Sequence, residues 1–81
     1  MTRAKINRTI RTLLGLSGKE LADRVEVTKQ TISNYECERF TTYRPLERVI
    51  EIELDLELEK CNDEHIKNLC ETLKLERTSP Q

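Results

Sequence analysis

Four polar side chains between positions 29 and 34 have the chemistry needed to contact the edges of base pairs. They are Lys29, Gln30, Ser33 and Asn34. If this segment is helical, they share one face of it, because residues three and four apart are neighbours on a helix. Lysine donates to the guanine edge, and a glutamine amide binds adenine through two hydrogen bonds. A helix is about as wide as the major groove, so this face is suited to contact with double-stranded DNA; the alternative is a polar face that only meets solvent.

Two short helices would hold that face outward. Residues Ser17 to Glu20 have the form of a capping box, which predicts a helix beginning at Gly18. Thr28 is a suitable N-cap for a second helix over about residues 29–36. Only about three residues then separate the helices, so they must cross at close range. The crossing needs a small residue and aliphatic neighbours, which the sequence supplies as Ala22 with Leu21, Val25, Val27 and Ile32.

A further helix is predicted before this pair, over residues 3–14. Its apolar residues recur three and four positions apart, and Thr2 precedes it as a suitable N-cap. Gly15 can end it, because glycine readily adopts the left-handed conformation that closes many helices.

The segment after the pair combines two patterns. Residues 38–45 lack periodicity and end at Pro45, which predicts a loop followed by the first turn of a helix. From Ile50 to Glu59 apolar and acidic residues alternate, which is typical of a strand. Apolar residues also recur every four positions from Leu46 to Leu58, and glutamate and leucine favour helices. We therefore predict a helix over about residues 46–54, with a strand over 50–59 as the alternative.

A last helix is predicted after Asn62 or Asp63, either of which can cap it. Its apolar positions are Ile66, Leu69, Cys70 and Leu73. The tail, residues 77–81, is expected to fray.

The length of 81 residues allows a single domain, and 36% of the residues are apolar and 36% are charged. The charges are divided unevenly along it. Residues 1–45 carry nine basic and five acidic side chains, a net charge of +4, whereas residues 46–81 carry five and ten, a net charge of −5. The first part is therefore suited to a polyanion, and the acidic part, residues 46–76, to completing the core or to dimerisation.

Several classes of protein are disfavoured. No stretch is apolar enough to span a bilayer and no signal peptide is visible, so we expect a cytoplasmic protein without a membrane partner. We find no nucleophile paired with a base and no phosphate-binding loop, so we expect neither an enzyme nor a cofactor. Cys61, His65 and Cys70 would lack a fourth ligand as a structural zinc site, so we expect free thiols and no metal.

The stretch from Ile10 to Arg39 resembles the lambda-repressor/Cro-like (XRE-type) helix-turn-helix DNA-binding family. The resemblance implies an all-α fold, a lambda-repressor-like bundle of four to five short helices with the helix-turn-helix at about 18–36. It also implies that Arg11 pairs with Glu36 and so joins the first helix to the third. The residues that carry the resemblance are Arg11, Leu16-Ser17, Leu21-Ala22, Val25, Val27, Ile32-Ser33 and Glu36.

Three positions depart from the family pattern. Gly18 stands where the family usually has a phosphate-binding glutamine, and Glu26 and Glu38 stand where it usually has glycine. A residue other than glycine costs about 1 kcal/mol in the left-handed conformation, so remodelled turns are one expectation at those two positions.

The resemblance also implies roles for residues of the reading head. Lys29 and Gln30 would contact base edges, followed by Thr31, Ser33 and Asn34. Phosphates would be held at the start of the second helix by Ser17, Gly18 and Lys19, and on the flanks by Thr28, Arg39 and Arg44.

Two functions of different classes follow. The first is a transcriptional regulator, a small phage-type or mobile-element-type repressor that binds a palindromic operator as a homodimer. The second is a protein-binding module, an antitoxin or anti-repressor that holds a protein partner with its acidic half. In either case the candidate dimer or partner contacts are Leu54, Leu56, Leu58, Ile66, Leu69 and Leu73.

Overall fold

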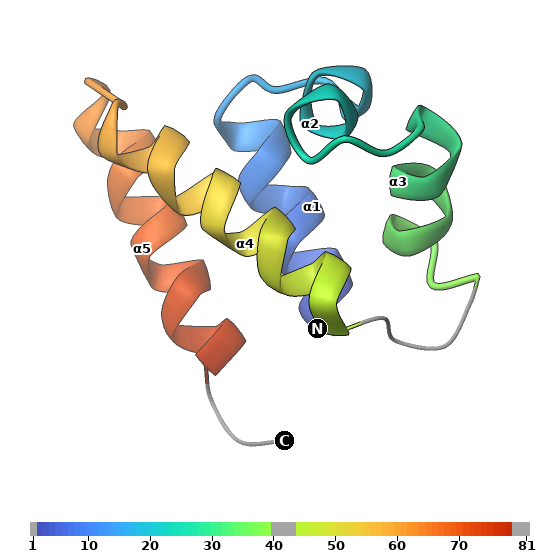
Figure 1. Ribbon diagram of the computed structural model, residues 1–81. Coiled ribbons are helices and arrows are strands. Elements are labelled where there is room, and N and C mark those ends of the chain that lie inside the picture. Colours follow the sequence, from blue (N-terminus) through green and yellow to red (C-terminus); the bar gives the residue numbers. More distant parts are fainter. Residues whose placement is uncertain (1, 40–43, 79–81) are drawn as a thin grey trace.

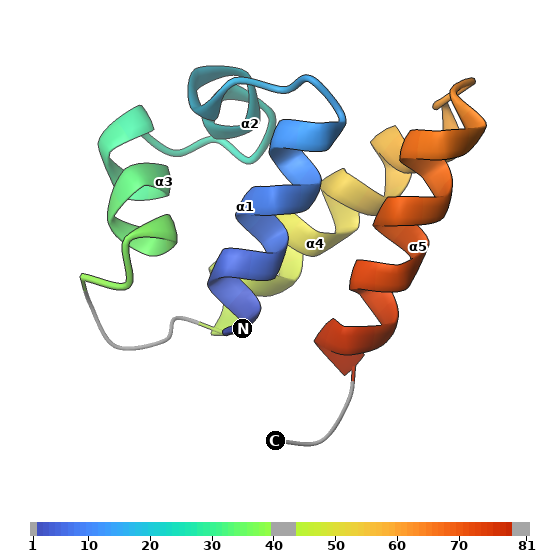
Figure 2. The same cartoon turned by 180° about the vertical axis from the view of Figure 1, so that it is seen from behind.

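The computed structural model describes residues 2–39 and 44–78. Within those ranges the fold is entirely helical, which confirms the predicted fold class. α1 packs against α3, α4 and α5, and α2 packs against α3 and α4. Both views place α3 and α5 at opposite ends of the molecule with α1 and α4 between them (Figures 1 and 2). The helices are α1 (Arg3–Leu13), α2 (Gly18–Arg24), α3 (Lys29–Glu36), α4 (Arg44–Glu59) and α5 (Glu64–Thr78).

The first three helices begin where their caps predict. The hydroxyl of Thr2 accepts from the Lys5 N–H, and that of Thr28 accepts from the Thr31 N–H. The capping box before α2 is complete, because Ser17 accepts from the Glu20 N–H while the Glu20 carboxylate accepts from the Ser17 N–H. These bonds satisfy backbone donors that a helix start leaves unpaired.

Three left-handed residues shape the turns. Gly15 after α1 has a φ of 78°, as its role in ending that helix requires. Glu26 and Glu38 have φ values of 60° and 56°, so they keep the geometry that glycine usually provides in the family. The expectation of remodelled turns is therefore wrong, and each glutamate bears a strain of about 1–2 kcal/mol.

α4 settles the choice between helix and strand. It runs to Glu59, so the strand alternative is wrong and the predicted helix over 46–54 was too short. Its residues four apart, from Leu46 to Leu58, form one buried face in the core, which explains why the helical period prevails. Of the predicted loop 38–45, Arg44 and Pro45 lie in the first turn of α4, and residues 40–43 lie outside the described ranges.

α5 is longer than predicted. Asp63 caps it, because its Oδ1 accepts from the backbone N–H groups of His65 and Ile66 at 3.0 and 3.2 Å. The helix continues to Thr78, and Arg77 is only 7% exposed. The prediction of fraying from residue 77 is therefore wrong for Arg77, whose guanidinium is held by residues of α1 and α4. Residues 79–81 lie outside the described part of the chain.

The six apolar residues predicted to contact a partner differ in how deeply they are buried. Leu54 and Leu58 are 0% and 2% exposed within this chain, which corrects the prediction that they contact another protein. Ile66 and Leu73 are half-buried against the same core. Only Leu56 and Leu69 remain largely exposed.

Cys70, one of the three residues considered as metal ligands, lies on α5. Cys70 is buried among apolar residues, and this burial raises the pKa of its thiol. Residues 2–39 and 44–78 contain no group of three acidic, histidine or cysteine residues arranged to hold a metal ion. In the same ranges, every helix is too short or too polar to span a bilayer.

Candidate nucleic-acid interface

α3 presents a polar face to solvent above a buried apolar one. Ile32 and Tyr35 are 1% and 4% exposed and anchor the helix in the core. Lys29 and Gln30 are exposed at its first turn. Thr31, Ser33 and Asn34 are half-buried along the same helix. The structure thus brings together the residues expected to contact base edges.

Gln30 and Asn34 are joined on this face. The Gln30 side-chain amide donates from Nε2 to Asn34 Oδ1 at 2.9 Å, one turn along the helix. The bond restricts both side chains, so less conformational entropy is lost if they bind a ligand. It leaves the Gln30 oxygen and the Asn34 amide group available as acceptor and donor.

A hollow of about 190 Å³ lies between α3, α1 and the start of α2. Gly18, Lys29 and Ser33 line it together with Arg8. A Cβ atom at Gly18 would have no neighbour within 4 Å beyond the adjacent backbone, so the surface is open at this position. Three residues predicted to bind DNA therefore share one concave surface with an additional cation.

Two other predicted phosphate ligands are already used locally. The Ser17 hydroxyl belongs to the capping box. Lys19 lies 3.3 Å from Asp23 in an exposed ion pair. Such a pair contributes little to stability, so Lys19 can exchange Asp23 for another anion.

The flank beyond α3 also carries predicted phosphate ligands. Thr28 caps α3 and shares a hydrogen bond of 2.8 Å with the Thr31 hydroxyl. Arg39 is exposed after the end of α3 and, within the described ranges, makes no ion pair. The Arg44 side chain is 75% exposed, with its Nη1 3.9 Å from Glu47 Oε1. Both guanidinium groups are therefore accessible from solvent.

An ion pair fixes α3 against α1. Arg11 Nε donates to Glu36 Oε2 at 2.7 Å, and Nη2 donates to Glu36 Oε1 at 3.1 Å. Arg11 Nη1 also donates to the Leu16 carbonyl oxygen at 2.7 Å. The pairing that the resemblance implies is thus present, and it holds the turn before α2 as well.

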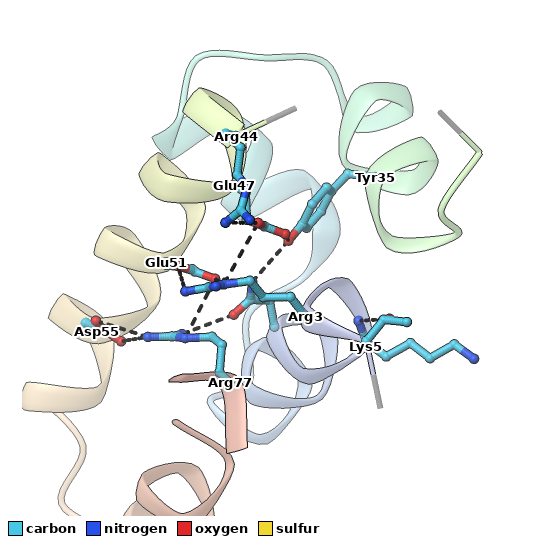
Figure 3. A network of polar contacts seen from close by, with 10 residues as sticks. Arg3, Lys5, Tyr35, Arg44, Glu47, Glu51, Asp55 and Arg77 are labelled. Carbon is cyan, nitrogen blue, oxygen red and sulfur yellow. Dashed lines mark hydrogen bonds and ion pairs between the residues drawn. The ribbon is translucent and has the colours of Figure 1, made fainter. Parts of the chain in front are cut away.

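A second group of polar contacts, which the sequence did not predict, lies behind α3 (Figure 3). Tyr35 donates from its hydroxyl to Glu47 Oε2 at 2.6 Å and accepts from the Asn7 amide at 3.0 Å. Asn7 donates also to Glu51 Oε2 at 2.9 Å, and Arg77 Nη1 donates to Asn7 Oδ1 at 3.0 Å. The available signal was Asn7 itself, a polar residue directly after Ile6 on the apolar face of its helix. We call Asn7, Tyr35, Glu47, Glu51 and Arg77 the polar cluster.

The polar cluster gives the fold a dependence on alkaline pH. Burial, together with the hydrogen bond to Glu47, raises the pKa of Tyr35 far above its usual value of about 10. A group whose pKa is higher in the folded state contributes stability below its unfolded pKa and loses that contribution as the pH rises. We expect Tyr35 to lower the free energy of unfolding by about 1.4 kcal/mol for each pH unit above about 10.

Urea unfolding of the wild type and the Tyr35→Phe variant between pH 8 and 11 checks this. The variant loses the hydrogen bonds to Glu47 and from Asn7 at every pH, so the informative quantity is the slope of stability against pH above 10. A wild-type slope no steeper than that of the variant would contradict the assignment.

A known protein family matches the part of the chain that contains α2 and α3. Residues 8–36 match the family model described as helix-turn-helix. The match contains α2, α3 and the Arg11–Glu36 pair, confirms the resemblance of this segment, and ends before α4 and α5. Neither the curated proteins nor the solved structures contain a match to the chain.

Proposed function

Residues 8–36 form a helix-turn-helix of the lambda-repressor/Cro-like (XRE) type, as found in DNA-binding regulators, and from this we propose a specific role. The protein is a sequence-specific repressor, of the compact kind that phages and mobile elements carry. Two copies bind a palindromic operator, each placing α3 in the major groove. The single observation that carries this proposal is the exposed polar face of α3 above its buried apolar face.

In this proposal the two ends of α3 have separate tasks. Lys29 and Gln30 lie at its first turn, and the first turn of a recognition helix is the part that reaches base edges. Arg39 and Arg44 lie beyond its other end, where they contact the sugar-phosphate backbone. Repression follows from occupancy alone, because a bound dimer covers the operator.

Replacing Gln30 with alanine is expected to reduce sequence preference. The variant should bind the operator about 5–150-fold more weakly, which corresponds to about 1–3 kcal/mol, and bind a scrambled duplex almost as well as the wild type. The operator is first recovered by selecting fragments from a genomic library with the purified protein. Titration of both duplexes by fluorescence anisotropy then measures the two affinities.

Arg44→Ala is the matched control. It should weaken operator and scrambled duplex by the same factor and reduce the dependence of log K on log salt by about one unit. Equal losses on the two duplexes for Gln30→Ala would contradict the assignment of Gln30 to base contact.

The second candidate is a protein-binding module, which the exposed apolar residues of the acidic half favour. Such a module would show almost no dependence of its binding on salt. A regulator with about six to ten phosphate contacts should lose about 10³–10⁵-fold in DNA affinity between 50 and 200 mM salt. The same titration repeated at several salt concentrations therefore separates the two functions.

A further inference from the structure

α4 carries two apolar stripes on opposite sides. The inner stripe, from Leu46 to Leu58 in steps of four, lies in the core. The outer stripe consists of Val49, Ile52 and Leu56, which are 43%, 54% and 47% exposed. In Figure 1 the side of α4 that faces the viewer is uncovered, and in Figure 2 α1 lies in front of it. The alternating sequence of this segment therefore leaves Val49, Ile52 and Leu56 exposed on the described part of the chain.

Four acidic residues of α4 are turned away from the outer stripe, whereas Glu53 is half-buried beside it, four positions after Val49. Glu47 and Glu51 belong to the polar cluster. Asp55 lies 3.3 Å from Arg77, and Glu57 lies 2.7 Å from Arg24, which lowers the pKa of the Glu57 carboxyl. Their charges are thus compensated by α1, α2, α3 and α5 rather than presented at the outer surface.

Exposed charges lie at both ends of the outer stripe, with Arg48 before it and Glu59 and Lys60 after it. Arg48 precedes Ile52 by one turn, and Glu59 follows Leu56 by nearly one turn. Both are exposed, and neither makes an ion pair with a described residue. Arg48 and Glu59 are eleven positions, or about three helical turns, apart, so they lie along the same side of the outer stripe and can each meet the other in an antiparallel copy.

We propose that the outer stripe of α4 is the contact with a second copy of this chain, with the two α4 helices antiparallel about a two-fold axis. In the register that places Ile52 on Leu56 of the second copy, Arg48 lies within one residue of Glu59 of that copy. The two-fold axis makes this ion pair twice. The antiparallel arrangement also opposes the two helix dipoles.

This inference rests on the proposed function only in that a palindromic operator requires a dimer. The evidence for it comes from the surface of α4 and does not depend on α3. Leu69, which the sequence analysis also assigned to a partner contact, lies on α5 outside the outer stripe. It therefore offers a matched control.

Sedimentation equilibrium of the full chain between about 1 and 100 µM tests the contact. We expect a reversible dimer for the wild type and for Leu69→Glu. Ile52→Glu should raise the dissociation constant at least about 30-fold, because each dimer would bury two such charges. Its melting temperature, measured where both proteins are monomeric, should stay that of the wild type, since the Ile52 side chain is 54% exposed.

A charge exchange tests the register. Arg48→Glu and Glu59→Arg should each weaken the dimer, because each places like charges together twice. The double variant Arg48→Glu/Glu59→Arg should restore it. A wild type that stays monomeric at 100 µM, an Ile52→Glu variant that dimerises normally, or a double variant no better than the single ones would overturn the proposal.

Binding to a duplex with one half-site separates this proposal from the proposed function. Ile52→Glu should bind the half-site like the wild type while losing cooperative binding to the full operator. If the wild type dimerises through α4 and binds no duplex, the proposed function fails and the contact stands. If every variant binds the half-site and none dimerises, the contact fails and the proposed function stands.

Discussion

Replacing Arg11 with methionine is expected to lower the free energy of unfolding by about 3–5 kcal/mol. The Arg11 and Glu36 side chains are 13% and 9% exposed, so the change leaves a largely buried carboxylate without its cation. It also removes the donor to the Leu16 carbonyl oxygen. Methionine retains most of the aliphatic stem, so lost packing contributes little to the effect. For a domain of this size, whose stability is about 4–12 kcal/mol, the loss is a large fraction of the total.

A double-mutant cycle identifies the cause of that loss. Arg11→Met/Glu36→Leu removes both charges and should regain most of the stability, because an apolar pair of similar volume often replaces a buried ion pair without cost. The measurement is urea unfolding followed by circular dichroism at 222 nm. A double variant as unstable as Arg11→Met would show that the pair acts through something other than its charges.

Replacing Arg77 with methionine is expected to cost about 2–3 kcal/mol. The side chain is 5% exposed, and its guanidinium donates to Asn7 and lies within 3.3 Å of Asp55. The change leaves the Asn7 oxygen buried without that donor. Glu51 keeps its bond from Arg3 at 2.8 Å, which limits the loss. Arg77 Nε is itself buried without a hydrogen-bond partner, so part of the cost of burying the arginine is absent from the variant.

Lys74→Met is the matched control for Arg77. Lys74 lies 3.8 Å from the same Asp55, but its side chain is 30% exposed. We expect a change below about 1 kcal/mol. Urea unfolding of both variants measures the difference, and equal losses would show that only the charge near Asp55 matters. A negligible loss for Arg77→Met would return residue 77 to the frayed tail that the sequence predicted.

The sequence by itself determined the reading head. The caps at Thr2, Ser17 and Thr28 act on backbone groups within three residues, so they were visible as local patterns. The polar face of α3 follows from the same local period once the helix has begun. Local interactions of this kind depend on neighbouring residues, which is why the bounds of α3 were predicted without the structure.

The second half depended on the tertiary structure. Between residues 50 and 59 the sequence satisfies both a period of two and a period of four, and the choice is made by the surface that α1 offers to Leu54 and its neighbours. The outer stripe exists only because that choice is helical. A strand would have put Ile52 and Leu56 on the same face as Leu54, with Val49 on the other.

The polar cluster shows the same limit most clearly. Arg77 and Asn7 are 70 positions apart, and each by itself resembles an ordinary polar residue of a terminal helix. Burial makes them partners, because a guanidinium enclosed by α1, α4 and α5 must find acceptors among whatever side chains those helices present. Local hydrogen bonds can be predicted from residues a few positions apart in the sequence. Contacts between distant segments are determined only when the chain has packed.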